Sequence, residues 1–119
     1  MAKRDTTVER RRELFDEAVL IIEESYSADL DLDWVARKVA TSRRQLQRAF
    51  AEIGRTTFRD HLAEVRMRHA VELLRGSTVP VREVATSVGY RQPAQFAKAF
   101  RRHHGAPPSS VRRDVSLAA

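Results

Sequence analysis

Hydrophobic residues recur along this chain every three or four positions, the spacing of helices with one buried side, and no stretch alternates long enough to make a strand. The first such segment runs from Val8 to Tyr26. Its predicted core residues are Leu14, Phe15, Ala18 and Ile22. The same spacing returns in later segments, so we predict an all-α fold of about seven helices.

Residues with strong positional preferences mark where the next two helices begin. Asp31 is expected to cap a helix that ends near Val39. Ser42, followed three positions later by Gln45, has the pattern of a capping box for a helix over residues 43–53. A tight turn would then separate two short helices.

The second half of the chain carries a comparable set of boundary signals. Thr57, with Asp60 three positions later, repeats the capping pattern and begins a predicted helix over residues 57–75. Proline suits the first turn of a helix and glycine suits its end. By this rule the next two helices begin near Pro80 and Pro93 and end at Gly89 and Gly105, and "PPSSVRRDV" makes a last short helix.

Two segments of the chain match each other, "LDLDWVARKVATSRRQLQRAF" at 30–50 and "VPVREVATSVGYRQPAQFAKAF" at 79–100. One residue is added in the turn of the second copy. The aligned pairs are Val35-Ala36 with Val84-Ala85, Val39 with Val88, Ala40 with Gly89, Leu46 with Phe96, Arg48 with Lys98, and Phe50 with Phe100. Each copy has the helix-turn-helix pattern of a short helix, a tight turn and a second helix.

The charge of the chain indicates what type of partner it binds. The chain has 22 basic and 16 acidic residues, a net charge of +6, which favours a polyanionic partner. Residues 13–33 hold eight acids and no Lys or Arg, whereas residues 34–119 hold 17 basic and 6 acidic residues. A general preference for arginine would explain the total but not this segregation, which predicts that one end of the chain is repelled by phosphate and the rest is attracted.

The second helix of the first repeat has a polar face suited to nucleic acid. Its apolar side holds Leu46, Ala49, Phe50 and Ile53, and its opposite side holds Arg44, Gln47 and Arg48. Arginine reads guanine and glutamine reads adenine through paired hydrogen bonds, and the major groove admits one α-helix. A solvated amphipathic helix would mix glutamate with lysine there, but residues 43–48 contain no acid. We therefore predict insertion into the major groove of double-stranded DNA.

The predicted organisation is a polar lead at 1–9, a first helix-turn-helix subdomain at 10–56, a connecting helix at 57–75, and a second subdomain with the tail at 76–119. A 19-residue connecting helix is about 28 Å long at 1.5 Å per residue. Successive major grooves lie ~34 Å apart along one side of DNA. One chain could thus reach two grooves, so we expect a monomer on an asymmetric, bipartite site.

Several function classes find no support in the sequence. Without cysteine there are no disulfides, thiolate metal sites or cysteine nucleophiles. His103 and His104 point about 100° apart on a helix, and nothing beside them completes a ligand set. We predict no enzyme activity, cofactor or metal. Neither a membrane span nor an apolar signal region is present, so we expect a cytoplasmic protein without a membrane partner.

The segment "VPVREVATSVGYRQPAQFAKAFRRHHGAPPSSVRR" resembles the second half of the DNA-binding domain of the AraC/XylS family of bacterial transcriptional regulators. "LQRAF", followed by "VRMRHAVELL", resembles the first half, and the likeness spans about residues 10–113. It implies seven helices, with one long helix joining two helix-turn-helix units. It also implies sequence-specific DNA binding by a short, single-domain regulator.

The resemblance assigns roles by position. The predicted base-contacting residues are Arg44, Gln47 and Arg48 in the first unit and Ala94, Gln95 and Lys98 in the second. The predicted phosphate-contacting residues are Arg43, Gln45, Arg91, Gln92 and Arg101. Ala94 and Ala97 stand where family members often carry polar readers, and alanine can only touch a thymine methyl. We therefore expect the first unit to discriminate bases and the second to hold phosphates, chiefly through Lys98 and Arg101.

Three alternatives stay open at this stage. The chain could be a DNA-targeting module cut from a larger sensor regulator or from a DNA-repair protein, since a related two-motif domain occurs in alkyl-transfer repair proteins. It could also be a protein-interaction module whose basic face binds an acidic partner. Family members that activate transcription recruit RNA polymerase, so the acidic first helix is a candidate polymerase contact, with solubility as its simpler role.

Overall fold

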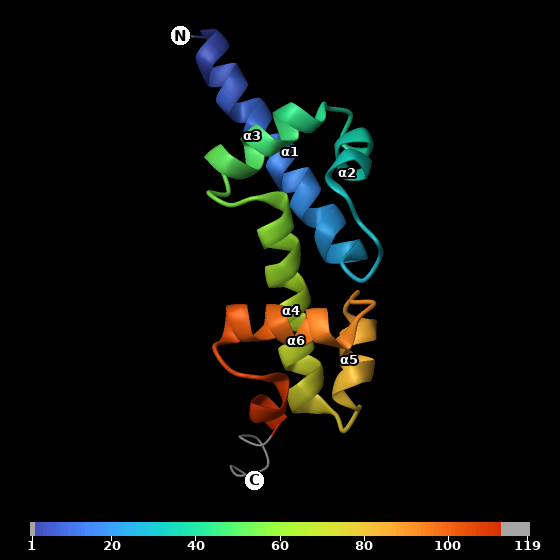
Figure 1. The fold of residues 1–119 in the computed structure, drawn as a ribbon. Coiled ribbons are helices and arrows are strands. Elements are labelled where there is room, and N and C mark those ends of the chain that lie inside the picture. Colours follow the sequence, from blue (N-terminus) through green and yellow to red (C-terminus); the bar gives the residue numbers. More distant parts are fainter. Residues whose placement is uncertain (1, 113–119) are drawn as a thin grey trace. The chain divides into compact units, whose positions relative to one another are not determined.

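The computed structural model describes residues 2–112 and contains only helices in that range, joined by short turns (Figure 1). The helices are α1 (Ala2–Ser25), α2 (Leu32–Lys38), α3 (Arg43–Glu52), α4 (Phe58–Gly76), α5 (Val81–Ser87) and α6 (Pro93–His104). Residues 108–112 are helical as well. The predicted all-α fold with about seven helices is therefore confirmed, and the rest of the predicted last helix lies outside the described residues.

Capping side chains set the starts of three helices as predicted. The carboxylate of Asp31 accepts a hydrogen bond from the backbone N–H of Trp34 at 2.8 Å. The Ser42 hydroxyl accepts one from the N–H of Gln45 at 3.1 Å, and the Thr57 hydroxyl accepts one from the N–H of Asp60 at 3.1 Å. Each bond satisfies one backbone donor that the first turn of a helix leaves unpaired.

Two predicted helix starts differ from the structure. α1 begins at Ala2, six residues before Val8, and Val8 itself is exposed. Apolar spacing marks only the buried part of a helix, whereas each residue that lengthens an existing helix adds a backbone hydrogen bond and needs no core contact. Pro80 precedes α5 as its N-cap, with φ −55° and ψ 145°, so α5 starts one residue later than its proline.

The chain forms two compact units, residues 1–62 and 63–119, and the division falls inside α4. In the first unit α1 packs against α2 and α3. Phe50 of α3 is fully buried, and the rings of Phe15 and Phe58 meet it edge to face at 5.2 and 6.0 Å. His61 packs on the same ring at 5.8 Å. A Cβ at Gly54 would lie 2.5 Å from the Phe15 ring, so only glycine permits this packing.

The second unit has its own core. Its buried apolar residues are Val65, Met67, Ala70 and Leu74 of α4, Val84, Ala85 and Val88 of α5, Phe96 and Phe100 of α6, and Val111. The side chain of Arg112 donates a hydrogen bond from Nε to the carbonyl of Leu74 at 3.3 Å. This bond satisfies a carbonyl near the end of α4 and attaches the last described residues to the unit.

The same backbone turn follows α2 and α5. After α2, the N–H of Ala40 bonds to the carbonyl of Arg37 at 3.1 Å, and the N–H of Thr41 bonds to the carbonyl of Ala36 at 2.9 Å. This pair of bonds defines a Schellman motif, which requires a left-handed residue just past the helix. Ala40 takes that conformation at φ 56°, although alanine pays a steric cost there.

In the second unit Gly89 occupies the equivalent position at φ 106°. Its N–H bonds to the carbonyl of Thr86 at 3.1 Å, and the N–H of Tyr90 bonds to the carbonyl of Ala85 at 2.9 Å. The guanidinium carbon of Arg66 lies 5.4 Å from the centroid of the Tyr90 ring, and 3.0 Å from where a Cβ on Gly89 would sit. The alignment of Ala40 with Gly89 thus reflects a shared backbone conformation.

We predict opposite stability changes at the two turns. Gly89→Ala should lower the free energy of unfolding by ~1–2 kcal/mol, because a Cβ is strained in the left-handed region and crowds Arg66. Ala40→Gly should raise it by about 0.5–1 kcal/mol, the relief of strain less the added freedom of the unfolded chain. Urea unfolding followed by circular dichroism measures both.

Gly76→Ala is the matched control, since an added Cβ there meets no atom within 4 Å and the residue does not have positive φ. Its stability should stay level or rise. A loss in Gly76→Ala as large as in Gly89→Ala would contradict the turn as the cause.

Candidate nucleic-acid interface

Helix α3 places one set of side chains in the core and another in solvent. Leu46, Ala49 and Phe50 have no exposed surface, which fixes the rotation of the helix about its axis. The side chains of Arg44, Gln47 and Arg48 are all exposed. Residues three and four positions apart lie on the same side of a helix. The three predicted base-contacting residues of the first unit therefore form one face, which we call the α3 reading face.

The predicted phosphate contacts at the margin of this face are exposed too. Arg43 pairs with Asp33 of α2 at 3.1 Å, and both side chains are more than half exposed, at 58% and 54%. An exposed pair of this kind contributes little to stability, so Arg43 can exchange the carboxylate for another anion at small cost. Gln45 keeps its side chain in solvent while its backbone N–H binds the Ser42 cap.

Helix α6 has the same construction in the second unit. It begins at Pro93, as predicted, and buries Phe96 and Phe100. The remaining predicted contacts are all exposed: Arg91, Gln92, Ala94, Gln95, Lys98 and Arg101. Ala97, which stands with Ala94 where family members often carry polar readers, is half-buried. Gly105 ends the helix at φ 84°, as predicted.

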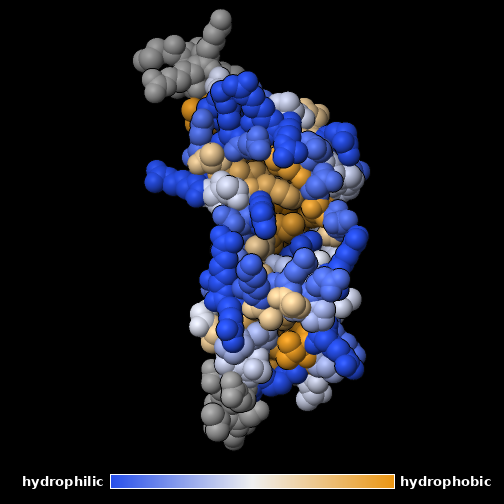
Figure 2. All heavy atoms as spheres, viewed as in Figure 1, coloured by the Kyte–Doolittle hydropathy of each residue, from blue (hydrophilic) through white to orange (hydrophobic). Residues whose placement is uncertain are grey.

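Charge is segregated on the elements themselves. Residues 43–51 and 93–104 contain no acidic residue, and the one acid of α3 is its last residue, Glu52, which pairs with Arg11 of α1. Asp16, Glu17 and Glu24 are exposed on α1. On the side of the molecule drawn in Figure 2, hydrophilic residues cover most of the surface and hydrophobic ones show between them. Within the first unit, residues 43–51 of α3 therefore attract an anion, and residues 13–25 of α1, which hold five acids and no Lys or Arg, repel one.

Trp34 and the adjacent pair His103 and His104 lie in surroundings that fit structural roles. Trp34 is half-buried, and the ammonium of Lys38 lies 5.2 Å from the centroid of its ring. His103 and His104 are exposed, and the ring of His104 lies 5.0 Å from that of Phe100. Among residues 2–112, no three His, Asp or Glu side chains gather in a way that could hold a metal ion. Over the same range, no helix has both the length and the apolar character to cross a bilayer.

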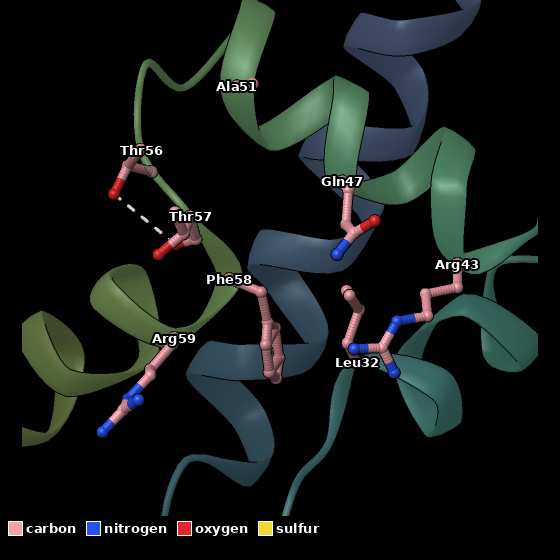
Figure 3. A pocket seen from close by; sticks show the side chains of 8 residues that line it. All are labelled: Leu32, Arg43, Gln47, Ala51, Thr56, Thr57, Phe58 and Arg59. Atoms are coloured by element: carbon pink, nitrogen blue, oxygen red, sulfur yellow. Dashed lines mark hydrogen bonds between the residues drawn. The ribbon is translucent and has the colours of Figure 1, made fainter.

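The structure also shows two features that sequence patterns did not indicate. The Arg66 contact with the second turn joins residues that lie 23 and 24 positions apart. A pocket of about 400 Å³ lies beside the α3 reading face (Figure 3). It is lined by Leu32 of α2, by Arg43, Gln47 and Ala51 of α3, and by residues 56–59, and we call it the α3 pocket. No local sequence signal marks either feature, because each depends on tertiary packing.

Comparison with known proteins places this geometry in a family. A family model described as "Helix-turn-helix domain" matches residues 35–114. The HTH-type transcriptional regulator GlxA of Rhizobium meliloti (strain 1021) is 38% identical over 92 residues, 77% of this chain and 28% of that protein. The chain spans about a third of the length of the curated relatives it matches.

Solved structures give the same result. A transcriptional regulator from Chromobacterium violaceum, described as an AraC-type DNA-binding domain-containing protein, matches with a TM-score of 0.83 and 25% identity, over 90% of this chain and 96% of that one. The DNA-binding domain of AdpA, solved in complex with a target DNA, matches with a TM-score of 0.82 and 28% identity, over 87% and 94%. The resemblance found in the sequence is thereby confirmed, and the chain belongs to the AraC-type family of helix-turn-helix DNA-binding domains.

Proposed function

We propose that this chain binds specific sequences of double-stranded DNA and regulates transcription in bacteria. The observation that carries the proposal is the repeated unit: two Schellman turns, each followed by a helix with a buried apolar side and exposed cationic and amide side chains on the other. A binding role rather than a catalytic one agrees with the family. The proposed place of action is the cytoplasm, where the bacterial chromosome lies.

Base discrimination is assigned to the α3 reading face. Arg44 and Arg48 are exposed one helical turn apart, and each can donate two hydrogen bonds to guanine O6 and N7. Gln47 can bind adenine in the same paired manner. Each such pair discriminates against the wrong base by ~1–3 kcal/mol. Arg43 and Gln45, at the first turn of the helix, are assigned to phosphates.

Helix α6 is assigned a smaller part in base discrimination than α3. Ala94 offers only a methyl group, which can touch thymine but forms no hydrogen bond. Gln95 and Lys98 are exposed beside it and reach base edges or phosphates. The cations on either side, Arg91 and Arg101, hold the backbone, and Gln92 adds an uncharged phosphate contact. Contacts of this type fix orientation on the duplex but carry little sequence information.

We propose that a monomer covers both halves of an asymmetric site. Helix α4 is continuous for 19 residues, about 28 Å, and contributes core residues to both units. That length is comparable to the ~34 Å between successive major grooves. Neither a second chain nor a palindromic operator is then required.

A second candidate is the same DNA-binding function within a longer regulator. The relatives that match this chain are about three to four times as long as the matched segment, and they include an ornithine utilization regulator and an Msm operon regulatory protein. Both candidates share the DNA-binding step, so one experiment tests that step for both.

Selection from a random duplex library should yield one bipartite, non-palindromic site. We predict that this duplex binds one chain, measured by sedimentation equilibrium, and that log affinity falls linearly with log salt with a slope of about −3 to −4, for phosphate contacts from Arg43, Arg91, Lys98 and Arg101. A palindromic site bound by two chains would exclude the monomer model. Affinity that does not depend on salt would exclude DNA as the partner.

Single alanine variants should separate the two recognition helices. Arg48→Ala should weaken binding to the selected site by ~1–3 kcal/mol and relax one base position, because it removes a base contact. Lys98→Ala should weaken binding to all duplexes alike, because it chiefly removes a phosphate contact. Fluorescence anisotropy with the selected duplex and a scrambled one measures both. Equal, sequence-independent losses in the two variants would overturn this division of labour.

RNA polymerase is the protein partner proposed for the acidic side of α1. Leu20 is 62% exposed there, three positions after Glu17 and four before Glu24, so the face combines an apolar side chain with carboxylates. A single exposed apolar residue is common on protein surfaces, so the acidic charge of this face is what supports the proposal. This role applies if the regulator activates transcription.

Charge reversal tests the polymerase contact. Glu23→Lys with Glu24→Lys should reduce transcript output in a reconstituted assay and leave affinity for the selected duplex unchanged. Glu17→Lys, at an exposed position of the same helix, should also reduce transcript output, and a substitution at an exposed position is a guard against misfolding as the cause. The matched control is Glu64→Lys on α4, which should not change output. Unchanged transcription in both α1 variants would remove polymerase as the partner of this face.

A further inference from the structure

The α3 pocket has an apolar floor and cationic walls. The side chains of Leu32 and Phe58 point into the same space between α2, α3 and the start of α4 (Figure 3). Phe58 is 8% exposed, so an edge of an otherwise buried ring forms part of the surface. A volume of about 400 Å³ lies within the ~300–1,000 Å³ of small-molecule sites.

The charged residues among those that line the pocket have a single sign. Arg43 and Arg59 line the pocket, and in the view of Figure 3 their guanidinium groups lie on either side of Phe58. No Asp or Glu is among the lining residues. The hydroxyls of Thr56 and Thr57 and the amide of Gln47 add neutral hydrogen-bonding groups at the rim. The ligand that complements such a site is an anion with an apolar body.

One contact already shows what Arg43 can bind. Its guanidinium holds the Asp33 carboxylate at 3.1 Å through one terminal nitrogen. Guanidinium has five N–H donors in a planar arrangement that suits carboxylates, so donors remain for a second acceptor. Because the pair is exposed, a ligand carboxylate can also displace Asp33 at small cost.

We propose that the α3 pocket binds an aromatic monocarboxylate. The ring would lie against Leu32 and Phe58, where an aromatic contact adds to the burial of apolar area. The carboxylate would bind Arg43, with Arg59 adding attraction across the rim. Gln47 would donate its amide N–H to the ligand.

Occupation of the pocket has a consequence for DNA, which rests on the proposed function. Arg43 and Gln47 line the pocket and belong to the proposed phosphate and base contacts. A ligand bound to them removes one cation and one base reader from the interface. The aromatic acid and DNA therefore compete, and the acid acts as an inhibitor of DNA binding.

The test uses the full chain and 2-naphthoate as the probe, followed by ¹H–¹⁵N NMR titration. We expect saturable shifts centred on the Gln47 side-chain amide and on residues 56–59, with a dissociation constant on the order of 0.1–1 mM. The neutral amide 2-naphthamide and inorganic phosphate, which lack the charge and the apolar body respectively, should each bind at least about five-fold more weakly.

Matched variants locate the site. Arg43→Gln should weaken 2-naphthoate binding about five- to ten-fold, whereas Arg48→Gln, an exposed arginine on the same helix that does not line the pocket, should leave it unchanged. Ala51→Leu keeps a good helix former and fills the pocket, so it should abolish saturable binding. Equal affinity for acid and amide, or equal effects of the two arginine variants, would overturn the proposal.

Competition with DNA is measured separately, by anisotropy of the selected duplex at rising 2-naphthoate. A several-fold loss of DNA affinity supports competition. Saturable binding of the acid with no effect on DNA would retain the site and refute the inhibition. A chain that binds the acid but no duplex would instead refute the proposed function.

Discussion

The directions of α3 and α6 depend on the turn that precedes each helix, in which a single residue takes the left-handed backbone conformation. In both units the chain leaves one short helix, turns at a residue with positive φ, and makes the same pair of backbone hydrogen bonds before the next helix starts. Without that turn the backbone donors and acceptors at the helix end would need other partners, and buried unpaired groups are costly. The direction of the second helix therefore follows from backbone geometry more than from its own side chains. This leaves the side chains on its outer face free to vary.

Burial then decides which side of the second helix meets solvent. Leu46 and Phe50 in one unit, and Phe96 and Phe100 in the other, have almost no exposed surface, and each side chain contributes about 1.5–3 kcal/mol through burial. A rotation of the helix about its axis would expose these residues and bury guanidinium groups, which costs several kcal/mol per charge. Burial of the apolar side of each helix thus determines which way its polar side faces. The exposed arginines need no ion-pair partner to point into solvent.

Much of this arrangement could be predicted from the sequence because its signals are local. Caps such as Ser42 and Thr57, the glycine that follows α6, and the apolar spacing of α3 each depend on neighbours within a few positions. The start of α1 could not be found this way, since a helix that continues beyond the core has no apolar pattern. The Arg43–Asp33 pair, the Arg66 contact with the turn and the α3 pocket also escaped prediction, because they join side chains from separate elements that only tertiary packing brings together.

Helix α4 couples the stability of the two units, because it contributes residues to both cores. Phe58 and Leu62 at its start belong to one core, and Val65, Ala70 and Leu74 further along belong to the other. Initiating a helix is unfavourable whereas lengthening one is nearly free, so whichever core forms first supplies the nucleus from which the rest of α4 grows into its neighbour. The units then behave like adjacent sites in a one-dimensional cooperative lattice, in which melting one raises the probability that the other opens.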